Sequence, residues 1–170
     1  MWNKCVEFHG HECGGLAIGY QAALYARELL KIEKSQDEDI VCITENDACG
    51  VDAIQVMLGC SLGKGNLLIK MRGKQAFSIF NRRTGESVRL VLREMPELSR
   101  EERMEKLMHG DCHELFDVKE TVDKLPVKAK IFENCYCENC GEKTSENYIR
   151  LQGGKKLCLD CFEGYSRFLD

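Results

Sequence analysis

Two pairs of cysteines in the last quarter of the sequence have the spacing of a zinc site. Two residues separate Cys137 from Cys140 and Cys158 from Cys161, and 17 residues lie between the pairs. The thiolates of each pair can converge on one point, and two pairs complete the tetrahedron that Zn²⁺ adopts in structural sites. Cys135 would form a poorer chelating step with Cys137, so we leave it out of the ligand set. The sequence therefore predicts one structural Zn²⁺ held by four cysteines.

The residues around these cysteines predict a small module, residues 133–170. Gly141 permits the tight turn of a zinc knuckle, and Gly153-Gly154 predicts a hairpin between the pairs. We expect a short helix through Phe162 and Tyr165, which would make the module a treble clef or a zinc ribbon. It has too little core to fold without its metal. Five basic and six acidic residues from position 137 onward favour a structural or protein-contact role over nucleic-acid binding.

A second set of metal-ligating residue types occurs in the stretch FHGHECGG. His9, His11 and Cys13 occupy alternate positions, and alternation places side chains on one face of an extended segment. Cys49 stands at the predicted start of a helix, where the helix dipole favours a thiolate. Three ligands, His11, Cys13 and Cys49, with an open fourth position are typical of a catalytic or exchangeable site for zinc or another late first-row transition metal. The alternative is that these residues serve only packing and turn chemistry.

Hydrophobic periodicity places these residues among predicted helices and strands. Apolar residues at steps of three and four predict a helix from about residue 18 to 34, and a second helix runs from residue 47 or 48 to Gly59. Ser99-Arg-Glu-Glu is a capping box that opens a third helix. Short β-branched or alternating runs predict strands at IVCIT, LLIKM, AFSIF, SVRLVLR, LFDV and VKAKIF. The fold class is therefore α+β, with a mixed or antiparallel sheet and packed helices over residues 1–132.

Composition restricts the classes of function. Eleven cysteines without a secretory leader or a long apolar run favour a cytoplasmic metalloprotein and exclude a membrane span. The net charge of −4 makes nucleic acid an unlikely partner. Residues 64–93 carry eight Lys or Arg residues and one acid, between two acidic segments. These charges can neutralise one another within the fold or across a dimer, or the basic run can form a wall that attracts an anion.

The stretches FHGHECGGLAIGYQAA and ENDACGVDAIQVMLGCSLGKGNL resemble the FmdE family, which takes its name from the E component of formylmethanofuran dehydrogenase, from about Phe8 to Phe132. Gly14 stands where that family usually has proline. The resemblance implies an α+β core with a His/Cys metal site, in which His9 is a fourth ligand or a neighbour of the ligands. It also implies a homodimer, and the zinc module resembles the C-terminal finger of some members.

Two kinds of function fit these features. The first is a metal-dependent enzyme or enzyme subunit that acts on a small anionic compound, related to a molybdenum-linked one-carbon (formyl-group) oxidoreductase, with Asp47 and Asp52 as candidate bases. The second is a metal-sensing or transcription-regulatory protein, or an interaction module without catalysis, whose zinc module contacts a protein partner. An open core site would favour the first function, and a closed one the second.

Overall fold

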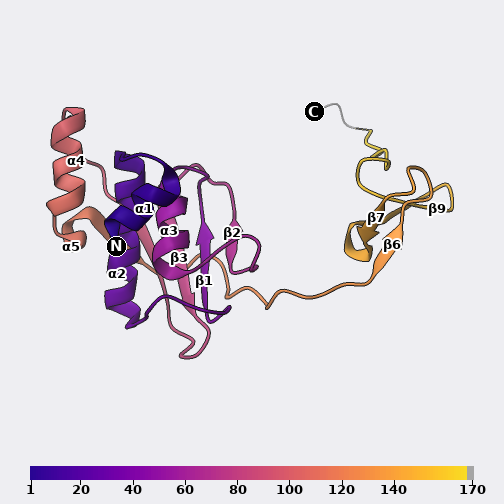
Figure 1. Ribbon diagram of the computed structural model, residues 1–170, viewed down its shortest axis with the longest axis horizontal. Coiled ribbons are helices and arrows are strands. Elements are labelled where there is room, and N and C mark those ends of the chain that lie inside the picture. The colour runs from indigo at the N-terminus through magenta and orange to yellow at the C-terminus, as the bar shows by residue number, and fades with distance from the viewer. Residues whose placement is uncertain (168–170) are drawn as a thin grey trace. The chain divides into compact units, whose positions relative to one another are not determined.

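The computed structural model describes residues 1–167, which form two compact units divided between residues 129 and 130. The first unit is an α+β fold, as predicted (Figure 1). No helix in residues 1–167 has the length and apolar character that crossing a membrane requires. The elements of this unit are α1 (Trp2–His9), α2 (Gly14–Leu30), β1 (Ile40–Thr44), α3 (Gly50–Leu58), β2 (Leu67–Ile69), β3 (Ala76–Asn81), β4 (Ser87–Leu92), α4 (Arg100–His109), α5 (Cys112–Leu115) and β5 (Phe116–Lys119).

The five strands form one mixed sheet in the order β2-β1-β3-β4-β5. β1 and β2 are parallel, with α3 in the connection between them, and the other neighbours are antiparallel. The prediction of a strand at VKAKIF is wrong, because residues 127–132 lie outside every strand. The nearby chain is held by side chains instead, as Arg82 Nη1 donates a hydrogen bond to the carbonyl oxygen of Pro126 at 2.7 Å.

The two faces of the sheet have different partners. Cys42, Phe77 and Leu90 point to the face that packs on the helices, in one core with residues of α2 and α3. Val41 and Ile43 point to the opposite face, where they are also buried. Successive residues of a strand point to opposite faces of the sheet, and both faces are covered at β1. β1 is therefore buried along its whole length and has no polar side.

The second unit consists of two short hairpins. β6 (Asn134–Tyr136) pairs with β7 (Lys143–Ser145), and β8 (Arg150–Gln152) pairs with β9 (Lys155–Leu157), around the predicted turn at Gly153-Gly154. A 3₁₀ turn, Glu146–Tyr148, connects them. The helix expected through Phe162 and Tyr165 does not form within the described residues, which end at 167. The first cysteine pair lies in the turn between β6 and β7, and the second pair follows β9, an arrangement that is consistent with a zinc ribbon.

Candidate metal centre

The contact between α2 and α3 determines which residues meet at the centre. A Cβ atom at Gly19 would lie 1.9 Å from the carbonyl oxygen of Gly50, so the two helices touch backbone to backbone. Cys13 is the N-cap of α2, and Cys49 is the N-cap of α3. A Cβ atom at Gly15 would lie 3.4 Å from Cys49 Sγ and 3.9 Å from Cys13 Sγ. The close crossing therefore brings together two thiols that are far apart in sequence.

The two histidines reach the same place by a route that the sequence pattern did not predict. His9 is the last residue of α1 rather than part of an extended segment, and Gly10 turns the chain with φ 93°. The His9 and His11 rings lie 4.6 Å apart between centroids. One ligand atom from each of His9, His11 and Cys13 lies within 4.8 Å of the others. The predicted residues are thus assembled by a helix end and a left-handed glycine, not by strand alternation.

His9 is oriented towards the thiols by a carboxylate. Its Nδ1 lies 2.7 Å from Asp52 Oδ2, and its Nε2 lies 3.7 Å from Cys13 Sγ. A carboxylate that accepts a hydrogen bond from one ring nitrogen leaves the other nitrogen free for a metal, which is the usual support for a metal-bound histidine. Asp52, one of the two candidate bases, thus lies against His9, where its carboxylate can orient the ring. Asp47 is exposed in the loop before α3.

The two thiols are held in different ways. Cys13 Sγ accepts a hydrogen bond from the backbone amide of Leu16 at 3.3 Å. Burial raises the pKa of the Cys49 thiol, and the hydrogen bond with Cys13 raises it further. The helix dipole was expected to lower the pKa of Cys49, but burial and the neighbouring Cys13 thiol outweigh that effect. A metal cation bound between the two sulfurs would favour the thiolate instead, because metal binding displaces the thiol proton.

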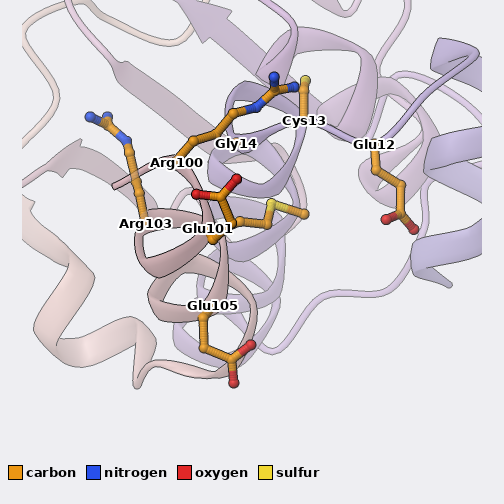
Figure 2. A pocket seen from close by; sticks show the side chains of 8 residues that line it. Glu12, Cys13, Gly14, Arg100, Glu101, Arg103 and Glu105 are labelled. Carbon is orange, nitrogen blue, oxygen red and sulfur yellow. The ribbon is translucent and has the colours of Figure 1, made fainter. Parts of the chain in front are cut away.

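Two pockets adjoin the centre. Cys13 opens into a pocket of about 580 Å³, which α4 lines with Arg100, Arg103 and Met104 (Figure 2). Glu12, Glu101 and Glu105 add carboxylates to its wall. A second pocket of about 330 Å³ contains His9 and Cys49 together with Asp52. The capping box at Ser99 predicted α4, and both of its hydrogen bonds are present, but nothing in the sequence showed that α4 borders the site.

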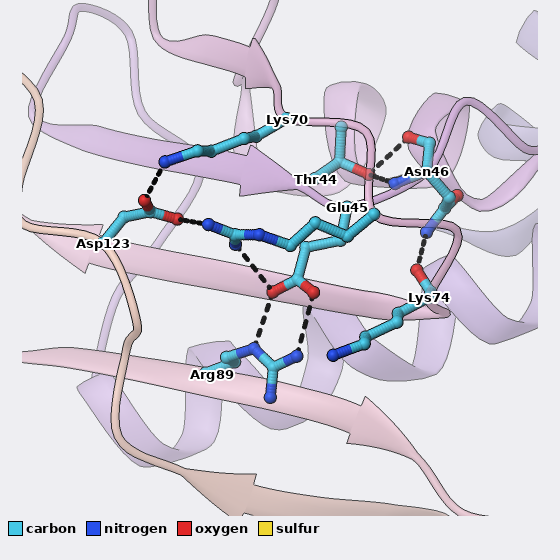
Figure 3. A network of polar contacts seen from close by, with 8 residues as sticks. Thr44, Glu45, Asn46, Lys70, Lys74, Arg89 and Asp123 are labelled. Carbon is cyan, nitrogen blue, oxygen red and sulfur yellow. Dashed lines mark hydrogen bonds and ion pairs between the residues drawn. The ribbon is translucent and has the colours of Figure 1, made fainter.

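The basic run does not form the predicted wall at the centre. In residues 64–93, no Lys or Arg lines either pocket. Arg89 instead makes two hydrogen bonds to the fully buried Glu45, at 2.6 and 2.9 Å, on the sheet face opposite the helices (Figure 3). Arg72 bridges Glu45 at 3.3 Å and Asp123 at 2.8 Å, and Lys70 also pairs with Asp123. These charges neutralise one another within the unit, which was the other interpretation of the run.

The four tail cysteines gather in the second unit. One sulfur from each lies within 4.8 Å of the other three. Cys137 Sγ accepts a hydrogen bond from the amide of Cys158 at 3.3 Å, and this bond and the amide of Cys140 lower the pKa of Cys137 to about 6. Asn139 Nδ2 donates to Cys161 Sγ at 3.3 Å. Amides that point at sulfur stabilise thiolates, which is the form that binds Zn²⁺.

Comparison with known proteins agrees with this architecture. Residues 8–140 match the model of the FmdE family, described as belonging to the molybdenum formylmethanofuran dehydrogenase operon. Residues 130–167 match the prokaryotic DksA/TraR C4-type zinc finger. The crystal structure of a tungsten formylmethanofuran dehydrogenase FmdE-like protein from Syntrophus aciditrophicus superposes with a TM-score of 0.67 at 25% identity, covering 98% of this chain and 92% of that one.

A curated relative from Archaeoglobus fulgidus is named a probable S-adenosyl-L-methionine-binding protein. It is 31% identical over an alignment of 202 positions, which covers 95% of this chain and 52% of the relative. The chain thus spans about half the length of this relative. The match over residues 8–140, the α+β core and the four-cysteine ribbon lead to one conclusion: the chain belongs to the FmdE family and carries a C-terminal C4-type zinc finger.

Proposed function

We propose that the first unit is a metal-dependent module that binds and acts on a small anionic compound. His9, His11 and Cys13 hold Zn²⁺ or another late first-row metal, and Cys49 supplies a further thiolate beside them. The observation that carries this proposal is the aim of His9 Nε2 at Cys13 Sγ while Asp52 occupies Nδ1. Mixed nitrogen and sulfur ligands suit zinc best among the common divalent metals.

The pocket beside Cys13 supports a small anionic ligand. Its volume of about 580 Å³ falls within the range of small-molecule sites. Arg100 extends from the start of α4 towards Cys13 (Figure 2), and a guanidinium presents two parallel donors to a carboxylate or phosphate. The ligand would contact the metal on one side and the guanidinium on the other. We propose this role for Arg100 and Arg103 in place of the basic run.

S-adenosyl-L-methionine is a second candidate ligand, because a relative is named for binding it. The 580 Å³ pocket combines two arginines with three glutamates, and this mixture suits the carboxylate and ammonium groups of an amino acid moiety.

Calorimetric titration of the metal-loaded protein with formate, phosphate and S-adenosyl-L-methionine compares the candidates directly. Arg100→Ala should weaken whichever ligand binds, whereas Lys106→Ala, on the same helix but outside this pocket, should not. Equal binding by both variants would contradict the assignment.

The second unit is proposed to be a structural zinc module that contacts a protein partner. Cys137, Cys140, Cys158 and Cys161 hold its Zn²⁺, and exposed Tyr148, Leu151 and Tyr165 offer contact surface. We propose that the metal-binding core comprises residues 1–132 and the zinc module residues 133–170. A closed four-ligand core site without ligand binding would favour the alternative function, a metal-sensing regulator.

The metal contents of two serine variants test the two sites separately. We expect Cys158→Ser to lose one zinc equivalent and to make the tail sensitive to protease, while the core stays folded. Cys49→Ser should lose or strongly weaken a different equivalent and leave the tail resistant. Asp52→Asn keeps every ligand and should lower the core-metal affinity roughly 10–100-fold, because His9 loses its orienting carboxylate. Full metal content in both Cys49→Ser and Asp52→Asn would refute the core centre.

We also propose that the chain forms a homodimer, because its family resemblance implies one. Light scattering at micromolar concentration should give twice the chain mass of 19.4 kDa. The internal neutralisation of the basic run removes charge complementarity as a reason for dimerisation, so the measured mass should depend little on salt. A monomer mass would contradict the proposal.

A further inference from the structure

A second group of metal-ligating side chains lies outside the centre described above. Glu28 in the last turn of α2 and Cys112 and His113 at the start of α5 each offer one ligand atom, all within 4.8 Å of one another. His113 Nε2 lies 3.0 Å from Glu28 Oε1. We propose that these three residues form a separate zinc-type site, with water as the fourth ligand.

The histidine of this group is held as a metal-bound histidine would be. Tyr25, one turn before Glu28, packs its ring on His113 with centroids 4.7 Å apart, and its hydroxyl lies 3.1 Å from His113 Nδ1. Tyr25 is 5% exposed, so this anchor belongs to the core. With a metal bound, Nδ1 would donate to the tyrosine oxygen, and the lone pair of Nε2 would point at the cation that Glu28 shares. A surface ion pair alone would not need the second nitrogen to be fixed.

The backbone places the remaining donors beside that nitrogen. Asp111 caps α5 by accepting a hydrogen bond from the amide of His113 at 2.9 Å, which fixes the first turn of α5. Cys112 packs partly against the core, so its thiol has a defined direction. The carboxylates of Glu28 and Asp111 both lie close enough to act electrostatically on Cys112, and together they favour a cation. One thiolate, one imidazole and one carboxylate suit zinc, and three protein ligands leave an open position.

A metal here would fasten α5 to the end of α2. At this place α5 and α2 are joined by the His113 contacts with Tyr25 and Glu28. Nearby, Gln21 Nε2 of α2 donates a hydrogen bond to the carbonyl oxygen of Met108 in α4. The same α4–α5 segment carries Arg100 and Arg103, which line the pocket beside Cys13. The proposed ion therefore fixes the end of the segment that forms one wall of that pocket.

The test is a Zn²⁺ titration of the full-length protein against a chromophoric chelator, with elemental analysis of the product. We expect wild type to bind one equivalent more than Cys112→Ser and Glu28→Gln, two variants that change the site in different ways. Tyr25→Phe should keep the equivalent with roughly 10–100-fold lower affinity, since the histidine loses its orienting contact. The matched control is His109→Ala, because His109 also faces a glutamate, Glu105, at 3.8 Å but has no cysteine beside it. It should bind as wild type does.

Unchanged stoichiometry and affinity in both Cys112→Ser and Glu28→Gln would overturn the proposal and leave a simple ion pair. The same outcome in His109→Ala as in Cys112→Ser would also overturn it, since the bound zinc would then be non-specific surface binding. The ligands share no residue with the core centre. Loss of metal from Cys49→Ser, with unchanged stoichiometry and affinity in both Cys112→Ser and Glu28→Gln, thus rejects this site alone. Full metal content in both Cys49→Ser and Asp52→Asn, with loss from Cys112→Ser, rejects the core centre alone.

Discussion

Replacing Gly19 with alanine is expected to destabilise the first unit by about 3 kcal/mol or more and to abolish core-metal binding. The added methyl would lie 1.9 Å from the Gly50 carbonyl oxygen, so α2 and α3 must move apart. Overpacking against side chains costs about 1–3 kcal/mol, and backbone cannot yield as a side chain can. Separation of the helices would also part Cys13 from Cys49. Calorimetric unfolding together with metal analysis measures both effects.

The direction of the change in stability distinguishes a tight helix crossing at Gly19 from an ordinary glycine within a helix. Alanine in place of glycine within a helix normally stabilises by about 1 kcal/mol. Gly63→Ala is the control for the substitution itself: Gly63 lies in a turn outside the helices, a Cβ atom there has no neighbour within 4 Å, and the backbone needs no positive φ. We expect Gly63→Ala to keep wild-type stability and metal content. A Gly19→Ala protein that unfolds at the wild-type temperature would show that the crossing is not tight.

Replacing Arg89 with methionine is expected to cost about 3–5 kcal/mol of stability, as removal of one partner from a buried ion pair generally does. Glu45 is fully buried, and the variant would leave it with Arg72 as its only ion-pair partner among the described residues. Arg93→Met is the matched control at the end of the same strand. Its pair with Asp117 is exposed, so its loss should cost less than about 1 kcal/mol.

The pH dependence of this loss identifies its cause. The hydrogen bond from Arg89 holds the pKa of Glu45 below its ordinary value of 4.5. A carboxyl group whose folded pKa is depressed stabilises above its unfolded pKa, and that contribution disappears as pH falls through the folded pKa. The unfolding temperatures of wild type and Arg89→Met should therefore differ most at neutral pH and converge in acid. A difference that stays constant with pH would show that lost packing, not charge, is responsible.

The sequence predicted those parts of the fold that depend on neighbouring residues. The capping box at Ser99, the helix that ends at Gly59 and the alternation in β4 are local patterns, and each occurs in the structure. α1 was missed because it has only eight residues: Trp2, Cys5 and Val6 recur at helical spacing, but so short a run does not distinguish a helix from a loop. It is helical through tertiary contacts, such as burial of Cys5 and packing of Trp2 on Tyr20.

The sequence indicated the residue types of the proposed site but not their geometry. His9, His11, Cys13 and Cys49 could be singled out because few other residues bind transition metals. Alternation also placed Arg89 correctly opposite Leu90, yet it could not show that the second face is covered and the arginine is paired. Both outcomes depend on contacts between residues distant in sequence. For the same reason, the sequence did not show that α4 forms a wall of the pocket.

The position of His9 at the end of α1 has a kinetic consequence. An isolated helix of eight residues is unstable in water, so α1 persists only while it is docked. Its anchors include buried Cys5, the Trp2–Tyr20 contact and the contact of His9 Nδ1 with Asp52 at 2.7 Å. Release of α1 would withdraw a histidine from the proposed core metal without unfolding the sheet. The rate at which this metal exchanges should then be limited by undocking of α1. At high chelator concentration, where the chelator binds the metal faster than α1 redocks, the rate of metal removal should no longer depend on the chelator concentration.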